Sequence, residues 1–137
     1  MGGAGKTLTL DEIIAINYRQ IERFGGLYLE GNDNLLNPGT LESVLAACQG
    51  PLFGVDRYPT VVDKAAAIAW FIITGHVFHD GNKRTGLLAC YTLLALNGYQ
   101  LPIDRAARDI ALQVADGQVS LEDFTAWIEA RVELLAE

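Results

Sequence analysis

The chain has 137 residues, half of them hydrophobic, and a formal net charge of −7. This length fits one domain with a substantial core, and the ten basic residues are scattered rather than gathered in the stripe typical of nucleic-acid binders. The longest apolar stretch, residues 65–74, is much shorter than the roughly 20 residues that a transmembrane helix needs, so no membrane segment is expected.

The N-terminal segment, MGGAGKTLTL, contains one lysine and no apolar core of a signal peptide. Its GGAGKT resembles a phosphate-binding loop, but the first glycine of that motif is missing and no strand precedes it. We interpret residues 1–8 as a flexible tail. Cys48 and Cys90 each lie in apolar, helix-like surroundings, which favours buried, reduced thiols over a disulfide and indicates a cytoplasmic protein.

Start and stop signals then divide the chain into helices. TLDE at 9–12 is a capping box, in which the threonine hydroxyl accepts from a backbone N–H and the glutamate reaches back. Apolar residues at helical spacing follow, and GG at 25–26 ends this first helix. NP at 37–38 provides the N-cap and first position of a second helix, which ends near Gln49. Between the two helices, LYLE at 27–30 leaves room for one short strand pairing.

The third and fourth helices are the most apolar. Pro59 opens the third helix, and its body, residues 61–73, is apolar on nearly every face, which is typical of a helix buried on all sides. A fourth helix starts at residues 81–82 and stops at the NG of 97–98. The tryptophans and the other aromatic residues fall at helical spacing, which places them in the core rather than in a cofactor site.

Two further helices complete the chain. Asp104 caps a fifth helix, which ends at the DG of 116–117. SLED at 120–123 resembles a capping box with aspartate in place of glutamate, and it opens a sixth helix with an apolar stripe. No repeat, linker or low-complexity tract interrupts the pattern. The sequence therefore predicts one compact all-α domain of about six helices over residues 9–137, with a buried central helix.

Both histidines lie in HVFHDGNKRTG, residues 76–86, between the two most apolar helices. Phe78 can anchor this segment in the core. Asp80 and Gly81 provide a sharp turn, because glycine tolerates backbone angles that are closed to other residues. The fourth helix begins at Asn82, and a helix N-terminus presents free N–H groups and a partial positive charge, which suit a phosphate.

Charged side chains around this turn suit phosphoryl chemistry. Lys83 adds a point charge and Arg84 a bidentate fork, and both match phosphate oxygens. Asp80 is a hard oxygen ligand beside them, placed to hold a nucleotide-bound Mg²⁺. His76 supplies a base that can take a proton from an attacking hydroxyl near neutral pH. Each residue alone fits an ordinary capped turn, but the set predicts transfer from a Mg-nucleotide to an alcohol.

The segment HVFHDGNKRT, residues 76–85, resembles the signature of the Fic/Doc family, H-x-F-x-[D/E]-[G/A]-N-[G/K]-R. The resemblance extends to the first helix and loop at residues 8–27 and to the last helix at residues 117–128. It implies a fold of about six helices, with ATP as co-substrate, and His79 falls on a variable slot. The roles that it implies are general base for His76, Mg²⁺ ligand for Asp80, phosphate-binding loop for Gly81, Asn82, Lys83 and Arg84, and structural anchor for Phe78.

Two positions set the expected subgroup. Adenylyltransferases of the family resemble H-x-F-x-[D/E]-G-N-G-R-x-x-R, whereas this chain has Lys83 in place of the second loop glycine and Leu87 in place of the last arginine. The lysine fills space near the nucleotide phosphates, and the leucine removes a guanidinium fork. Both changes match Doc-type members, which resemble kinases that move the γ-phosphate onto a protein hydroxyl. The resemblance thus implies a toxin of a toxin–antitoxin pair that modifies a threonine of elongation factor Tu and halts translation.

Other functions stay open at this point. One is AMP transfer to a protein hydroxyl, and another is a non-enzymatic interaction module that keeps only an anion-binding turn. The intact set of His76, Asp80, Asn82 and Arg84 argues against the module. A metal site built on His76 and His79 lacks a further ligand set beyond Asp80.

An enzyme of this kind needs restraint. Some family members carry an inhibitory helix resembling [S/T]-x-x-x-E-[G/N], and GLYLEGN at residues 26–32 has its Glu-Gly-Asn but a glycine where Ser or Thr belongs. We therefore expect a separate cognate antitoxin, with a partly disordered segment that folds into a groove. The irregular segments 27–36 and 50–58 are candidates for the surface that docks the acceptor protein.

Overall fold

A computed structural model describes residues 5–51 and 53–135 of the chain. This part folds into an all-α domain of six helices, which confirms the predicted fold class. The short remaining elements are a 3-10 helix, η1 (Glu30–Asn32), and a two-stranded sheet that pairs β1 (Tyr99–Gln100) with β2 (Glu133–Leu134). The six helices are α1 (Leu10–Phe24), α2 (Gly39–Ala47), α3 (Val61–Thr74), α4 (Asn82–Leu96), α5 (Arg105–Ala115) and α6 (Leu121–Arg131).

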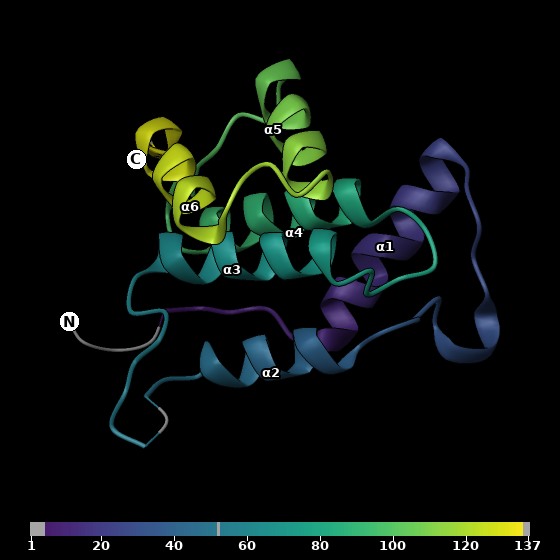
Figure 1. The fold of residues 1–137 in the computed structure, drawn as a ribbon, viewed down its shortest axis with the longest axis horizontal. Helices are drawn as coiled ribbons and strands as arrows, with labels where there is room; N and C mark the ends of the chain where they lie inside the picture. The colour runs from purple at the N-terminus through teal and green to yellow at the C-terminus, as the bar shows by residue number, and fades with distance from the viewer. Residues whose placement is uncertain (1–4, 52, 136–137) are drawn as a thin grey trace.

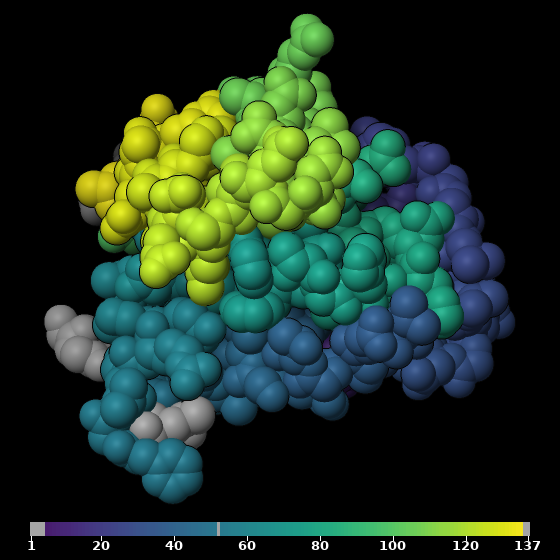
Figure 2. Space-filling model, viewed as in Figure 1, coloured from purple at the N-terminus to yellow at the C-terminus, as the bar shows by residue number. Residues whose placement is uncertain are grey.

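Helix α3 lies in the middle of the domain, as predicted for a helix that is apolar on every face (Figure 1). It packs on α4 and contacts α2, α5 and α6. In the space-filling view, α5 and α6 form a layer over α3 and α4, while α2 covers the opposite side (Figure 2). The turn that joins the end of α3 to the beginning of α4 lies at the edge of this arrangement, on the side of α1 (Figure 1).

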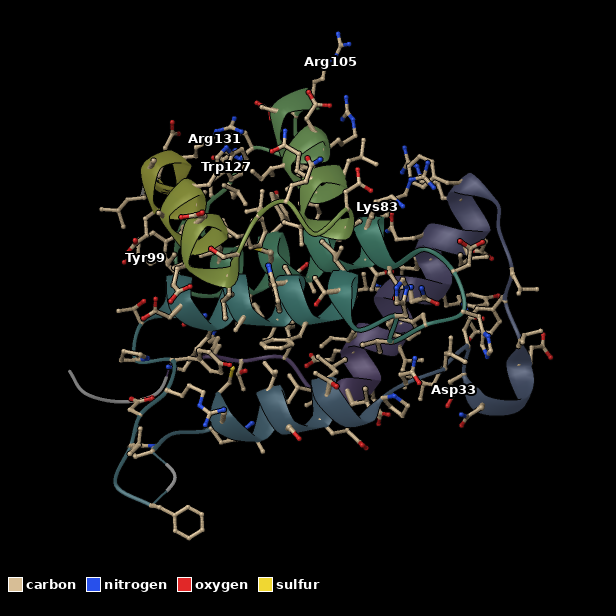
Figure 3. All side chains as sticks on the ribbon, in the orientation of Figure 1. Asp33, Lys83, Tyr99, Arg105, Trp127 and Arg131 are labelled. Atoms are coloured by element: carbon tan, nitrogen blue, oxygen red, sulfur yellow. The ribbon has the colours of Figure 1, made fainter. Side chains whose placement is uncertain are left out.

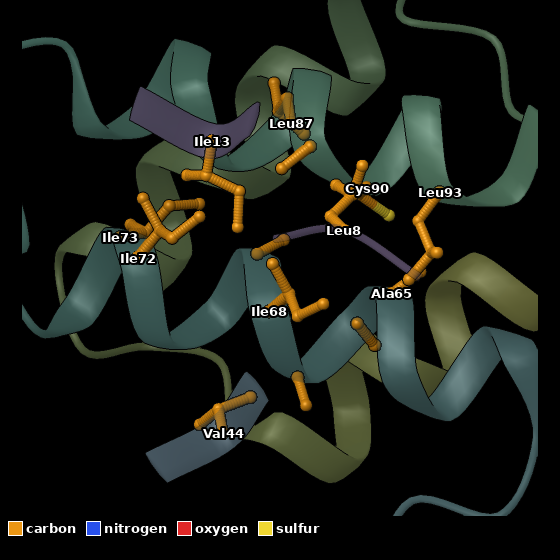
Figure 4. Packing of buried hydrophobic residues seen from close by; sticks show 14 of the residues in the cluster. Leu8, Ile13, Val44, Ala65, Ile68, Ile72, Ile73, Leu87, Cys90 and Leu93 are labelled. Atoms are coloured by element: carbon orange, nitrogen blue, oxygen red, sulfur yellow. The ribbon is translucent and has the colours of Figure 1, made fainter. Parts of the chain in front are cut away.

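Small residues bring α3 and α4 close together. Residues 65–69 of α3 are fully buried, and four of these five are alanines. On α4, a Cβ added to Gly86 would lie 2.8 Å from Cγ1 of Ile73 and 3.0 Å from the carbonyl oxygen of Ala69. The surrounding cluster also draws on α1 and α2, through Ile13 and Val44 (Figure 4). Full burial of a valine or isoleucine side chain stabilises the fold by about 1.5–3 kcal/mol. Because α3 and α4 are packed closely in this cluster, they hold the turn that joins them in a fixed position.

Most helix boundaries agree with the local signals in the sequence. Both hydrogen bonds of the capping box at the start of α1 are present, and the side chains of Asp104 and Ser120 cap α5 and α6. The prediction that Pro59 opens α3 was wrong, because Thr60 is the N-cap, forms a capping box with Asp63, and the helix begins at Val61.

Two other predictions need correction. Asn37 does not cap α2, whose N-cap is Pro38; its side chain donates instead to the carbonyl oxygen of His76 at 3.2 Å. Residues 27–30 form no strand, and the two short strands pair residues 99–100 with 133–134. Both differences arise because the partners are distant in sequence, so the local pattern contained no information about them.

The structure also shows where part of the N-terminal segment and the two cysteines lie. Residues 1–4 of the expected tail lie outside the described residues, whereas Lys6 exchanges two backbone hydrogen bonds with the Asn97 side chain and Leu8 is buried. Cys48 and Cys90 are buried and unpaired, as predicted, and burial raises their thiol pKa values to about 11 and about 12. None of the helices in the described ranges has the length and apolar character required to cross a bilayer.

Candidate active site

A cleft of about 500 Å³ opens where α3 passes into α4. The α3–α4 turn forms one side of it, and Arg108, Ala111 and Leu112 of α5 form the other. Lys83, at the start of α4, lies between α5 and the end of α1 (Figure 3). Six of the seven residues predicted for the site line this cleft, namely His76, Asp80, Gly81, Asn82, Lys83 and Arg84.

The start of α4 is an open helix N-terminus. Its N-cap is Gly81, in the left-handed conformation at φ 78° and ψ 16°, so no side chain caps the helix. A Cβ at Gly81 would lie 2.9 Å from Cδ1 of Ile21 and 3.2 Å from Nδ2 of Asn17, so both the conformation and the space require glycine. Within the described part of the chain, the backbone N–H groups of residues 82–84 have no hydrogen-bond partner. Such a terminus attracts anions.

The side chain of Asn82 shapes the turn instead of facing a ligand. Its Oδ1 accepts from the backbone N–H of Phe78 at 2.9 Å, and its Nδ2 donates to the carbonyl oxygen of Phe78 at 2.8 Å. Asn82 therefore offers the cleft its backbone N–H, while its amide closes the loop. Phe78, the seventh predicted residue, is 1% exposed and packs in the core below the cleft.

The loop between α1 and α2 braces the turn from outside. Its segment 34–37 runs antiparallel to residues 76–79, with a bridge between Leu35 and Phe78. The N–H of Leu36 donates to the carbonyl oxygen of Val77 at 2.7 Å, and the N–H of His79 donates to that of Asn34 at 2.9 Å. These bonds fix the backbone on both sides of Phe78.

His76 is exposed and lines the cleft. Its φ of 47° lies in the left-handed region, which residues other than glycine adopt uncommonly. Such a conformation persists only where the surroundings hold it, and the Asn37 side chain does so through the His76 carbonyl. His79, for which the motif implies no role, also lines the cleft.

The carboxylate of Asp80 is oriented by two backbone donors. Oδ2 accepts from the N–H of Leu27 at 2.9 Å, and Oδ1 accepts from the N–H of Gly81 at 2.8 Å. Each oxygen keeps a further lone pair. Nowhere in the described residues do three or more His, Cys, Asp or Glu side chains gather as a ligand set. A single carboxylate fits a Mg²⁺ ion that takes its other ligands from phosphates and water, and not a metal held by the protein alone.

The lining of the cleft is rich in basic side chains, although the protein as a whole is acidic. Lys83, Arg84 and Arg108 line it together with one carboxylate, that of Asp80. The guanidinium of Arg84 lies 4.4 Å from the ring centroid of Phe24, a cation–π distance that holds it at the end of α1. Sequence reasoning missed Arg108, because a lone arginine on an exposed helix face gives no signal until the fold brings it opposite the turn.

Comparison with known proteins defines the class of protein. Residues 7–94 match the model of the Fic/DOC family. This match covers more than half of the chain and includes every predicted site residue, so the protein belongs to the Fic/Doc family.

Two relatives narrow the similarity within the family. The chain is 35% identical over 105 residues to "Toxin Doc" of Mycolicibacterium smegmatis, an alignment that covers 74% of this chain and 81% of that protein. It is 28% identical over 114 residues to "Protein kinase doc" of Escherichia phage P1, with 81% of this chain and 83% of that protein covered. Both relatives are Doc proteins, the subgroup that the motif resembles.

Proposed function

We propose that this protein transfers the γ-phosphate of ATP to a serine or threonine hydroxyl of another protein. The observation that carries the proposal is that one cleft holds His76, the carboxylate of Asp80 and the N–H groups of residues 82–84, which have no hydrogen-bond partner among the described residues. Membership of the Fic/Doc family and similarity to a protein kinase doc support the same reaction.

Each residue has a defined task in this reaction. A ring nitrogen of His76 takes the proton of the acceptor hydroxyl, whose oxygen forms a bond to the γ-phosphorus while the bond to the β–γ bridging oxygen breaks and ADP leaves. The N–H groups at the start of α4, with Lys83 and Arg84, stabilise the negative charge of the phosphates. Mg²⁺, when bound at the Asp80 carboxylate, neutralises part of this charge.

Two features favour phosphate transfer over AMP transfer. Lys83 occupies the second position of α4, where a glycine would leave the backbone bare. Leu87, one turn further along α4, lines the cleft and is 5% exposed. An apolar side chain therefore stands where the adenylyltransferase motif has its last arginine. AMP transfer is therefore the alternative that the experiment below must distinguish.

In the cell, we propose that the protein is the toxin of a toxin–antitoxin pair. The name of its relative, Toxin Doc, supports this role. The proposed target is elongation factor Tu, whose modification would stop translation in a prokaryotic cytoplasm, and the proposed restraint is a separate cognate antitoxin. Glu30, the glutamate of the inhibitor-like segment, is exposed in η1 and does not line the cleft, which agrees with external restraint.

The decisive experiment uses ATP labelled at the α- or the γ-phosphate, with elongation factor Tu as acceptor and Mg²⁺ present. We expect label on the acceptor only from the γ-position. His76→Ala should lower the rate by roughly a hundredfold or more, the contribution typical of a general base. His79→Ala, at the other histidine of the cleft, should have a much smaller effect.

Each alternative predicts a different result. Transfer of the α-label alone would replace phosphate transfer by AMP transfer. No transfer of either label, together with bacterial growth inhibition that survives His76→Ala, would establish the non-enzymatic module. Transfer to other proteins of a lysate but not to elongation factor Tu would keep the reaction and reject the target.

A further inference from the structure

Three buried polar side chains lie directly behind the turn, at positions to which the motif assigns no role and which do not line the cleft. Asn17 of α1, Asn34 of the α1–α2 loop and Thr85 of α4 are each fully buried. Asn17 lies four residues from both Ile13 and Ile21, on the buried face of α1. A carboxamide at such a position is unfavourable unless all of its polar atoms are hydrogen-bonded.

Asn17 uses both ends of its carboxamide. Nδ2 donates to the carbonyl oxygen of Asp80 at 2.9 Å and to Oγ1 of Thr85 at 3.1 Å. Oδ1 accepts from Nδ2 of Asn34 at 3.0 Å. The orientation of the amide is determined by chemistry, because the opposite orientation would point an oxygen at the Asp80 carbonyl.

These bonds hold the first turn of α4 at both of its ends. The Asp80 carbonyl belongs to the peptide bond that precedes Gly81, whose left-handed conformation starts the helix. Thr85 closes the same turn, with its N–H donating to the carbonyl oxygen of Gly81 at 2.9 Å. The unpaired N–H groups of residues 82–84 lie between these two points. Asn17 thus binds the backbone carbonyl of Asp80 on one side of the proposed phosphate site and the side-chain hydroxyl of Thr85 on the other, and it does not line the cleft.

We propose that Asn17, together with Thr85, is a positioning residue that preorganises the amide groups at the start of α4. The assignment of the ligand as a nucleotide phosphate rests on the function proposed above. Donors that are fixed before the ligand arrives bind charge better than donors that must first be ordered. Loss of these bonds should therefore weaken nucleotide binding more than it weakens docking of the acceptor protein.

The test compares isosteric variants. Asn17→Asp removes both donated bonds and directs an oxygen at the Asp80 carbonyl. Thr85→Val removes the hydroxyl that accepts from Asn17, whereas Thr85→Ser keeps it and serves as the conservative rescue. Ile128→Val, at a fully buried position on α6, is the control for a general loss of stability.

Two measurements are needed for each variant. The first is the NMR order parameter of the backbone amides of residues 81–84 without ligand. The second concerns nucleotide binding and gives both the dissociation constant and the KM for Mg-ATP. We expect Asn17→Asp to lower the order parameters and to raise both constants by roughly tenfold to a hundredfold, since small misplacements of binding groups have effects of this size. Thr85→Val should show a smaller change in the same direction, and the KM for the acceptor should stay constant.

The outcomes separate this inference from the proposed function. Unchanged amide order and unchanged nucleotide constants in both Asn17→Asp and Thr85→Val would overturn the inference, as would equal losses in Ile128→Val. If Asn17→Asp does not fold, the comparison of Thr85→Val with Thr85→Ser tests the positioning role by itself. If the wild-type protein binds no nucleotide but the amides still lose order in the variants, the positioning role stands and the proposed function fails.

Discussion

The loops at the two ends of α3 each contain one non-glycine residue and one glycine with similar positive φ angles, but these residues differ in what surrounds them. Before α3, Phe53 has φ 52° and Gly54 has φ 79°; after it, His76 has φ 47° and Gly81 has φ 78°. A Cβ at Gly54 would meet nothing within 4 Å, whereas one at Gly81 would meet two side chains within 3.2 Å. Phe53 is fully exposed to solvent, while the carbonyl of His76 is held by Asn37.

Left-handed residues alone therefore do not distinguish the candidate site from the loop before α3. A hollow alone does not distinguish it either, because the loop before α3 borders a hollow of about 420 Å³, close in size to the cleft. Among the described residues that line that hollow, Arg57 is the one charged side chain. What distinguishes the turn after α3 is the framework of hydrogen bonds that holds strained backbone and charged side chains in one arrangement.

The largest expected effect is a difference in stability and activity between alanine variants of Gly81 and Gly54. Gly81→Ala combines left-handed strain with overpacking against Ile21, so we expect a loss of about 2–4 kcal/mol in the free energy of unfolding. Because the start of α4 moves, phosphate transfer should fall by roughly a hundredfold. Gly54→Ala has nearly the same φ but open space, so about 1 kcal/mol and unchanged kinetics are expected.

Chemical denaturation and steady-state kinetics of the two variants check this prediction. Helix α3 separates the two glycines, and its 14 residues span about 21 Å at the usual helical rise, so a change at one should not reach the other. Equal losses of activity in both variants would show that the hydrogen-bond framework has no special role at the turn.

The next largest effect is a difference in activity between alanine variants of two asparagines, Asn82 and Asn97, that make the same kind of contact. Asn82 clasps both backbone groups of Phe78, and Asn97 likewise exchanges two bonds with the backbone of Lys6. Replacing either by alanine should cost about 1–3 kcal/mol, mainly through backbone groups that lose their partners. Only Asn82→Ala should reduce phosphate transfer, by roughly tenfold or more, because only its clasp shapes the site.

Melting temperatures and kcat/KM, measured side by side, test the pair. If Asn97→Ala lowered kcat/KM as much as Asn82→Ala at matched stability, the loss would reflect general loosening of the fold. A normal kcat/KM in Asn82→Ala would mean that the bonds from segment 34–37 are sufficient to hold the turn.

Much of the fold could be predicted because helix boundaries are encoded locally. The capping box of α1, the Asp104 cap, the Ser120 cap and the glycine stops each depend on residues within four positions of one another. The capping box predicted at residues 120–123 is only half formed, because Ser120 accepts from the N–H of Asp123 and α6 has no complete box. The strand pairing for which residues 27–30 left room does not form. The β1–β2 pair was missed, because two-residue strands 34 positions apart carry no pattern in either segment. Pairing of that kind is decided by how the helices pack.

The site divides in the same way. Its motif is contiguous, so the residues between His76 and Arg84 could be found together in the sequence. Arg108 and Asn17 could not, since the first lies on the exposed face of α5 and the second interrupts an apolar stripe. An asparagine between isoleucines on a buried helix face is a usable signal for a structural hydrogen bond, but its partners Asp80 and Thr85 lie more than 60 positions away.

The smallest expected effect concerns α5, which faces the turn across the cleft. Arg131 of α6 lies 2.6 Å from Asp104, the cap of α5, and this contact, with the N–H of Ala107, lowers the pKa of Asp104 from 3.8 to about 2. A carboxyl whose pKa is lower in the folded state stabilises the fold above its unfolded value, and this contribution is lost as the pH falls through about 2. Because Asp104 is exposed, solvent screening keeps the contribution small.

Asp104→Asn isolates this contribution, since asparagine still caps a helix but carries no charge. We expect a slightly lower melting temperature at pH 7, a gap that closes as the pH falls from 4 towards 2 and that narrows in 1 M salt. Asp109→Asn on the same helix, which removes a carboxylate with no ion pair among the described residues, is the matched control. A gap that stayed constant down to pH 2 would assign the effect of Asp104 to capping alone, and α5 would then be anchored by its packing rather than by charge.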